Sequence, residues 1–377
     1  MSKKVFYWSP FFSNIATTKA VLNSAISIKK YSNDYYEPFI IDVFGEWDEY
    51  KNIIELYKIN LIKLNLDDHF KERIIHGFLK SRYYQIKIFI LSFIPLLRLL
   101  RSEKPEVMIL HLVTALPLII NFVFKNNIKT ILRISGYPKL NFIRKYYWNI
   151  VLRRVDSITA PTIDTCEYLK KKFKDLPVSH LKDPVINLKD IKYTIKKTSK
   201  KNSKYIAIGR LTKQKNFMFL IRCFSDILKK YPNSELYIFG EGEDHYKLNK
   251  FIQKNNLQKN ITLMGYKSNI FEYLRDCDAF LLSSLWEDPG FVLIEAAYSN
   301  TTIISSDCDN GPKEILNYGK NGFLFRSNNK KDFLNTFDKF KNSTEKDIFR
   351  KKVNAKKMSK NYSLLNHYLK LNKILHE

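Results

Sequence analysis

Two acidic side chains in the second half of the chain have a spacing that suits a ligand rich in hydroxyl groups. Glu287 and Glu295 stand in the segment SLWEDPGFVLIEAAYSN, residues 284–300, with seven residues between them. Glu287 follows an apolar run that is typical of a β-strand, whereas Glu295 falls in a run that is typical of a helix. One carboxylate is therefore expected on a loop and the other further along a helix, where each can accept hydrogen bonds from hydroxyls.

The residues between these glutamates predict an anion site. Asp288 and Pro289 are typical of the N-cap and the first position of a helix, which would run on from Phe291. Gly290 lets the backbone come close to a ligand, and the free N–H groups from that point can hold a phosphate. A molecule with hydroxyls at both ends and a diphosphate between them, such as a nucleotide sugar, fits this layout.

A basic loop follows another strand-like run. The segment GRLTKQKN, residues 209–216, begins with Gly209, which allows a tight exit from the strand. Arg210 and Lys215 could converge on a diphosphate, the first with a planar fork and the second with a compact charge. Alone, the loop could equally be an inert basic connection, but beside the helix start at Gly290 the phosphate interpretation is favoured.

Other candidate positions carry weaker signals. Gly240 and Gly242, in FGEGED, could admit a nucleotide base or ribose, or could simply form a turn. The segment SSDCDNGPKEIL, residues 305–316, joins a strand to a helix; its Glu314 could contact a ligand or simply favour the start of the helix.

The first half of the chain offers polar candidates at the ends of predicted strands. His111 ends the run VMILH, and Arg133 and Ser135 lie in RISGYPKL. Ser13 and Asn14 lie in the first predicted loop, SPFFSNIATTKA. Each could face a ligand, although a lone histidine or arginine can equally have a structural role.

Short apolar runs alternate with amphipathic stretches, which predicts an α/β fold with parallel sheets. Strands are expected in the first half at residues 5–8, 39–44, 59–64, 107–111, 130–134 and 157–160. Strands are expected in the second half at residues 205–209, 235–240, 261–265, 279–284, 302–307 and 323–325. The clearest helical patterns are residues 16–30 and 216–231. Two doubly wound, Rossmann-like domains would face each other across a cleft at the carboxyl ends of these strands.

The domain boundaries follow from changes in composition. Residues 1–190 are expected to form an acceptor-binding domain and residues 205–360 a nucleotide-sugar-binding domain, joined by the polar, basic linker 191–204. Residues 361–377 contain a final helix that could pack back on the first domain.

The composition is that of a globular protein with a large excess of basic residues. The 377 residues are 45% hydrophobic, and 64 Lys and Arg against 37 Asp and Glu give a formal net charge of +27. Such an excess attracts polyanions, although most of it is interpreted as solvated lysine. The four cysteines are scattered without metal-binding spacing, which favours a reducing cytoplasm, and the first residues do not resemble a signal peptide.

One apolar run is flanked by cations. Ile88–Leu97 has ten residues without a charge, fewer than the ~20 that a spanning helix needs. The flanking cations are Arg82, Lys87, Arg98 and Arg101. We expect this segment to lie on an anionic membrane surface, and the alternative is a core helix whose cations merely reach solvent.

Several of these motifs together resemble the retaining glycosyltransferases of family 4, which have the GT-B fold. The resemblance rests on GRLxxxKN at 209–216, GEG at 240–242, the glutamate pair and SSDCDNGPKEIL, and it is specific across residues 203–326. The sequence departs from the family at Asp288-Pro289, where Gly-Phe is usual, and at Ser135-Gly136, where His-Gly is usual. The glycine pair that is usual in the first loop is missing; Ser13 and Asn14 are nearby.

The resemblance assigns roles to the candidate donor-binding residues. It implies that Arg210 and Lys215 bind the donor diphosphate, Glu287 binds hydroxyls of the transferred sugar and Glu295 binds the ribose. Backbone N–H groups would come from Gly290 and Phe291. Glu287 and His111 are the candidate catalytic residues, and Gly209, Gly240 and Gly242 complete the donor site. No metal or other cofactor is expected.

The resemblance further implies a hexosyltransferase-type enzyme. It would move a sugar from a nucleoside diphosphate sugar to a growing surface glycan, such as O-antigen or capsule, on a polyprenyl diphosphate. This work would take place in the cytoplasm, at the inner face of the bacterial membrane. One alternative is a soluble GT-B enzyme that makes a storage sugar or small glycoside. Another is a nucleic-acid-binding protein, for which the sequence has no recognised motif.

Overall fold

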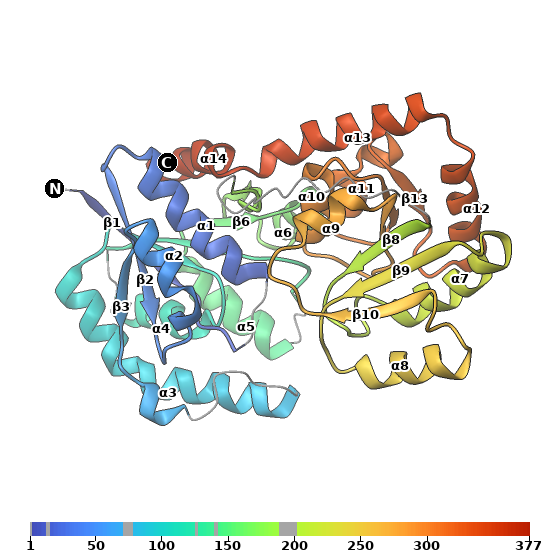
Figure 1. Cartoon of the computed structure of the whole chain (residues 1–377). Helices are drawn as coiled ribbons and strands as arrows, with labels where there is room; N and C mark the ends of the chain where they lie inside the picture. The colour runs from blue at the N-terminus through green and yellow to red at the C-terminus, as the bar shows by residue number, and fades with distance from the viewer. Residues whose placement is uncertain (1, 13–15, 71–77, 125–126, 139–141, 188–201) are drawn as a thin grey trace. The chain divides into compact units, whose positions relative to one another are not determined.

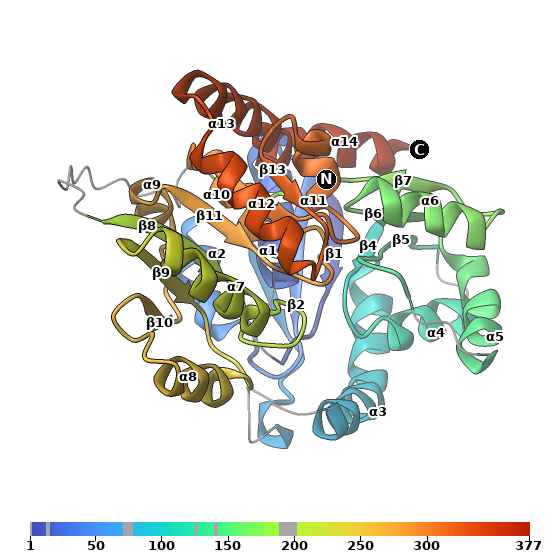
Figure 2. The same ribbon diagram turned by 90° about the vertical axis from the view of Figure 1, so that its right-hand side faces the viewer.

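The computed structural model describes residues 2–12, 16–70, 78–124, 127–138, 142–187 and 202–377, and these form two compact units. The N-terminal unit comprises Met1–Pro161, Thr165–Val185 and Leu364–Glu377, and the C-terminal unit comprises Thr162–Asp164 and Ile186–Ser363. Each unit is built on one parallel sheet with helices on its faces (Figures 1 and 2).

The N-terminal sheet has seven parallel strands in the order β3-β2-β1-β4-β5-β6-β7. The strands are β1 (Lys3–Trp8), β2 (Tyr36–Asp42), β3 (Asn60–Lys63), β4 (Val107–Leu110), β5 (Lys129–Arg133), β6 (Ser157–Ala160) and β7 (Val178–His180). The helices are α1 (Ala16–Tyr31), α2 (Lys51–Leu56), α3 (Phe78–Glu103), α4 (Ala115–Phe124), α5 (Phe142–Val151), α6 (Ile163–Lys172) and α14 (Leu364–His376).

Alternation along β1 divides the N-terminal core into two layers. Val5 and Tyr7 pack with residues of α1 and α14, whereas Phe6 and Trp8 pack on the opposite face with residues of α3 and α4. Successive side chains of a strand point to opposite faces, and helices cover both faces of a parallel sheet. The continuous apolar run of β1 is therefore buried throughout.

The C-terminal sheet has six parallel strands in the order β10-β9-β8-β11-β12-β13. The strands are β8 (Ser203–Ile208), β9 (Ser234–Phe239), β10 (Ile261–Gly265), β11 (Ala279–Leu282), β12 (Ile303–Ser306) and β13 (Phe323–Phe325). The helices are α7 (Phe217–Lys230), α8 (His245–Lys254), α9 (Phe271–Asp276), α10 (Phe291–Tyr298), α11 (Pro312–Ile315), α12 (Lys330–Lys341) and α13 (Glu345–Ser359). Short 3-10 turns are Asp48–Tyr50, Asp67–His69, Leu152–Arg154, Asn317–Gly319 and Lys360–Tyr362.

Each sheet has a switch point, where successive strands stop being added on one side of the first strand and start being added on the other side. In the N-terminal sheet this point lies between β1 and β4, and in the C-terminal sheet it lies between β8 and β11. Ligands of doubly wound sheets bind beyond the carboxyl ends of the strands at such switch points. The loops that follow these four strands are therefore the places to look for a site.

These sheets confirm the predicted α/β class with two doubly wound domains, although some local predictions differ. The short strand β7 was not predicted. The strand β8 begins at Ser203, inside the predicted linker 191–204, because Ser203 and Lys204 pair with β9; residues 188–201 lie outside the described part. The helix α3 continues through Pro95.

The last helix of the chain, α14, completes the core of the N-terminal unit. Its apolar residues pack with those of α1, so the red end of the chain lies beside the blue helix in Figure 1. A buried polar chain joins the two helices: the Tyr7 hydroxyl lies 2.9 Å from Ser24 Oγ, which lies 2.8 Å from His367 Nε2. His367 Nδ1 lies 2.8 Å from the Lys182 carbonyl oxygen, which can only accept. Nδ1 of His367 therefore carries a proton.

Burial makes this helix contact sensitive to acid. It lowers the pKa of His367 from 6.5 to about 4, and the nearby Arg133 cation acts in the same direction. The unfolded chain therefore binds a proton that the folded chain excludes between these pH values. The stabilisation is complete above pH 6.5 and is lost as the pH falls towards 4, by about 3 kcal/mol at most.

We expect the free energy of unfolding to fall less steeply between pH 6.5 and 4 in His367→Gln than in the wild type, because glutamine does not titrate. Denaturant unfolding at each pH measures this difference. An exposed histidine on another helix, His245→Gln in α8, is the matched control and should keep the wild-type slope. Identical slopes for all three proteins would show that His367 does not carry the effect.

Candidate functional site

The loop after β8 holds its lysine against its own first glycine. A Cβ atom on Gly209 would lie 2.8 Å from Cε of Lys215, so a larger residue there would displace this side chain. The Lys215 N–H donates to the Thr212 carbonyl oxygen at 3.1 Å, which closes the loop into a turn. Arg210, by contrast, is exposed. The loop thus directs one cation inward and leaves the other accessible to a ligand.

Lys215 forms a buried ion pair with Glu287. Lys215 Nζ lies 2.5 Å from Glu287 Oε1, and the two side chains are only 13% and 4% exposed. Ser284 Oγ donates to the same carboxylate oxygen, also at 2.5 Å. The strands β8 and β11 pair directly, so the loops that follow them meet at the switch point. The structure therefore brings together two of the predicted site residues.

A neighbouring loop supports the segment around Glu287. The Glu287 N–H donates to the Asp309 carbonyl oxygen at 3.1 Å, and Asn310 Nδ2 donates to Asp288 Oδ1 at 3.1 Å. A Cβ atom on Gly311 would lie 2.0 Å from the Pro289 carbonyl oxygen, so the two backbones are in direct contact. These contacts fix the position of the Glu287 backbone.

The helix α10 begins at Phe291, as expected, but its N-cap differs from the one that the sequence predicts. Its N-cap is Gly290, with φ at 97°, and not Asp288, which instead contacts Asn310. The left-handed conformation favours glycine, and a Cβ atom there would lie 3.4 Å from the Glu287 side chain. The first N–H groups of a helix lack acceptors within it, so those of Phe291 and Val292 are available to an anion beside Glu287.

Glu295 lies further along α10. It is the fifth residue of this helix, about 6 Å along the axis from Phe291, and is 7% exposed. Phe291 is equally buried and can offer only its backbone to a ligand. The two glutamates therefore lie on either side of the start of α10 along the chain, as the spacing predicts.

The glycines after β9 have a structural role in this site. A Cβ atom on Gly240 would lie 2.0 Å from the Gly209 carbonyl oxygen, and one on Gly242 would lie 2.5 Å from the Leu211 carbonyl oxygen. The Leu211 N–H also donates to the Glu241 carbonyl oxygen at 2.8 Å. The glycines thus allow the loops after β8 and β9 to touch. Their contact with a nucleotide stays a prediction.

In the N-terminal unit, His111 lies at the switch point. Its backbone N–H donates to the Trp8 carbonyl oxygen at 3.0 Å, which places it between the ends of β1 and β4. Among the described residues nothing hydrogen-bonds its buried Nδ1 atom. Burial lowers its pKa well below 6.5, with smaller effects in the same direction from Arg133 and His367. His111 is therefore a neutral imidazole.

Arg133 is engaged within the protein. Its Nε donates to Asp183 Oδ1 at 2.8 Å, a second guanidinium nitrogen contacts the other carboxylate oxygen, and both residues are buried. This pairing occupies a side chain that, from the sequence, could face a ligand. Ser135 is exposed just after β5, and Ser13 and Asn14 lie outside the described residues.

The sequence did not identify Ser284, Asp309 or Asp183. Ser284 lies three residues before Glu287, a position that could have suggested a hydrogen bond to it. Asp309 contributes only its backbone, and Asp183 lies 50 residues from Arg133. No local sequence signal indicates either contact.

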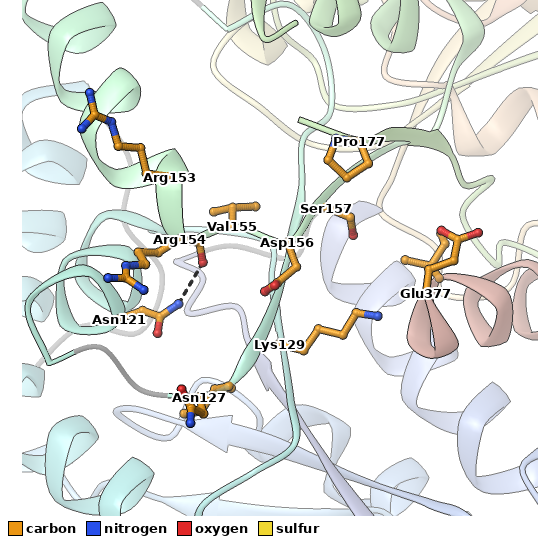
Figure 3. Close-up of a pocket in the computed structure, with 12 residues that line it drawn as sticks. Asn121, Asn127, Lys129, Arg153, Arg154, Val155, Asp156, Ser157, Pro177 and Glu377 are labelled. Atoms are coloured by element: carbon orange, nitrogen blue, oxygen red, sulfur yellow. Dashed lines mark hydrogen bonds between the residues drawn. The ribbon is translucent and has the colours of Figure 1, made fainter. Parts of the chain in front are cut away.

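A pocket of about 600 Å³ lies elsewhere, at the amino ends of β5 and β6 in the N-terminal unit (Figure 3). Its polar side chains hold the fold together: Asn121 Nδ2 donates to the Arg154 carbonyl oxygen at 3.1 Å, and Asp156 accepts from the Thr130 N–H at 2.6 Å. Arg153 and Arg154 lie on one side and Lys129 on the other, so these cations do not converge.

The described part of the chain has no cluster of side chains suited to metal binding or thiol chemistry. No group of three or more His, Cys, Asp or Glu residues there could hold a metal ion. The four cysteines are buried and none forms a disulfide, and burial raises the pKa of the Cys223 and Cys308 thiols to about 12.

Comparisons with known proteins agree with this architecture. Residues 190–360 match the family model "Glycosyl transferases group 1". An uncharacterised glycosyltransferase of Methanocaldococcus jannaschii is 34% identical over 59% of this chain and 60% of its own length. A Campylobacter jejuni N-acetylgalactosaminyltransferase, named for a diphospho-undecaprenol substrate, is 26% identical over 57% of this chain and 59% of its own length. The chain thus spans 60% or less of these relatives.

Solved structures share the fold of the chain. HepE of Anabaena, determined with UDP and glucose, has a TM-score of 0.72 at 14% identity. The superposition covers 100% of this chain and 100% of HepE. TarM of Staphylococcus aureus has a TM-score of 0.76 at 14% identity, again with full coverage of both chains. At such low identity these similarities define the fold alone, which is GT-B. Residues 190–360 therefore form a glycosyl transferases group 1 domain within a chain of GT-B fold.

Proposed function

We propose that this protein is a retaining glycosyltransferase that moves a sugar from a nucleoside diphosphate sugar to a hydroxyl of a growing, lipid-linked bacterial glycan. The observation that carries the proposal is the Lys215–Glu287 ion pair, which lies beside the start of α10 at the switch point of the C-terminal sheet. It combines a cation for a diphosphate with a carboxylate for sugar hydroxyls.

The cationic groups act on the leaving group. As the bond between the anomeric carbon and the diphosphate oxygen breaks, negative charge accumulates on the diphosphate. Arg210, Lys215 and the first N–H groups of α10 stabilise that charge without a metal ion. The acceptor oxygen bonds to the anomeric carbon on the same face, and its proton passes to the departing diphosphate. The anomeric configuration is thereby retained.

The carboxylates hold the two ends of the donor. Glu287 binds hydroxyls of the transferred sugar, and its hydrogen bond from Ser284 keeps it oriented when Lys215 turns to the diphosphate. Glu295, further along α10, binds the ribose hydroxyls. His111, neutral at the N-terminal switch point, is a candidate to contact the transferred sugar.

The names of the relatives support the donor and acceptor classes. HepE was determined with UDP and glucose, and an Escherichia coli relative, 31% identical over 46% of this chain, is named as a galactosyltransferase acting on a diphosphoundecaprenol-linked sugar. We therefore propose a polyprenyl diphosphate acceptor and action at the inner face of the membrane. Transfer to a soluble sugar without any lipid carrier would instead favour an enzyme that makes a storage sugar or small glycoside.

A thermal-shift screen of nucleotide sugars, followed by an assay of nucleoside diphosphate release with the donor that stabilises the protein, tests this function. A bound donor raises the apparent stability of the folded state. If no nucleotide sugar stabilises the protein and none is turned over, the proposal is wrong.

Arg210→Ala and Lys215→Ala should each reduce transfer by roughly 10²-fold or more, since each removes charge stabilisation from the leaving diphosphate. Steady-state kinetics with the identified donor measures this loss. Lys213→Ala, an exposed cation in the same loop, is the matched control and should retain wild-type rates. Unchanged kinetics in both site variants would remove these residues from the mechanism.

Substitutions of the two glutamates should affect different parts of the donor. Glu295→Ala should weaken binding of the free nucleoside diphosphate, whereas Glu287→Gln should keep that affinity but lose most transfer, because the free nucleotide lacks the sugar. Calorimetry with nucleoside diphosphate and a transfer assay give the two readouts. Equal loss of nucleotide affinity in both variants would show that the assignment is wrong.

A further inference from the structure

The helix α3 is apolar on the side that faces away from its own domain. Four large side chains on this side are strongly exposed: Tyr83 at 60%, Ile86 at 61%, Ile90 at 65% and Ile94 at 56%. They follow one another at intervals of three or four residues, which places them on one face of a helix. We call these four residues the outer face of α3.

The opposite side of α3 is packed into the N-terminal core. Tyr84, Ile88, Leu96 and Leu100 belong to the buried cluster that covers one face of the sheet. A helix on the surface of a soluble domain normally has one apolar stripe and a polar remainder. The core cluster that α3 joins does not include the outer face, so packing among the described residues does not explain the exposed isoleucines.

The charges that α3 itself carries beside the outer face are mostly basic. Arg82, Arg98 and Arg101 are exposed, and α3 contains a single acidic residue, Glu103, which pairs with Lys4 at 2.9 Å. Two other contacts show which cations serve the protein itself: Lys87 hydrogen-bonds the His69 carbonyl oxygen, and Arg101 lies over the Phe124 ring. Arg82, which donates to Gln85 Oε1 of the same helix at 3.0 Å, and Arg98 stand one turn before Ile86 and one turn after Ile94, so both lie beside the outer face.

From these observations we propose that the outer face of α3 docks the protein onto an anionic lipid bilayer. The isoleucines enter the boundary between headgroups and acyl chains, and the arginines bind the lipid phosphates. Each cation near an anionic surface adds about 1 kcal/mol. The proposal rests on the surface chemistry of α3 and stands whether or not the protein transfers sugar.

The helix lies on the bilayer and does not cross it. By length and composition alone, Arg82–Glu103 could span a membrane. Its packed stripe, however, holds it against the sheet of its own domain. A second copy of this chain is a poorer occupant, because two outer faces placed together would bring like-charged arginines into opposition.

Vesicle flotation tests the docking. The wild type should float with vesicles of phosphatidylcholine and phosphatidylglycerol, bind much less to phosphatidylcholine alone, and be partly released by high salt. The triple variant Ile86→Gln, Ile90→Gln, Ile94→Gln should lose roughly tenfold or more in partitioning, because the apolar insertion is removed. The variant Arg82→Gln, Arg98→Gln should lose a similar factor on anionic vesicles only.

A matched control variant replaces exposed apolar residues of other helices with glutamine. Tyr246→Gln with Phe349→Gln alters apolar residues of α8 and α13 that are 75% and 65% exposed, and should leave binding unchanged. Circular dichroism and thermal unfolding check that every variant is folded. Equal recovery of the wild type and both α3 variants with either lipid would overturn the proposal. So would a wild-type dimer that the isoleucine variant converts to monomers, since the occupant would then be a second copy.

Discussion

The ion pair between Lys215 and Glu287 is the constraint on which the C-terminal site depends. A buried charge without a partner costs several kcal/mol, so each side chain needs the other in the absence of a ligand. The pairing is possible because β8 and β11 are neighbours, and because Gly209 leaves room for the Lys215 side chain. The loops after these two strands are thereby held together, and the start of α10 is held with them.

The same pair explains what could and could not be predicted from the sequence. Apolar runs bounded by turn residues located most strands, since burial on both faces of a parallel sheet leaves a strong local signal. The meeting of Lys215 with Glu287, 72 residues apart, depends on the strand order. Asp288 was misassigned as a helix cap because its local preference is overridden by Asn310, which comes from the next loop.

The N-terminal unit shows how burial decides among candidate polar residues. Arg133 ends β5 and His111 follows β4, and from the sequence either side chain could have a binding or a structural role. In the structure, Arg133 is neutralised by Asp183, whereas His111 retains a buried nitrogen without a partner in the described part of the chain. Arg133 has a partner 50 residues away in the sequence, whereas no described residue hydrogen-bonds Nδ1 of His111. Strand-end position alone therefore does not identify a binding residue.

The position of α14 has a consequence for the synthesis of the protein. The helix packs against α1 and supplies Leu371, Ile374 and other residues to the core of the N-terminal unit. These residues leave the ribosome only after the whole C-terminal unit. The usual order, in which the first domain folds while the rest is being made, is therefore interrupted here. The N-terminal unit is the first to begin and the last to finish, and until then the surface of α1 that α14 covers is available to chaperones.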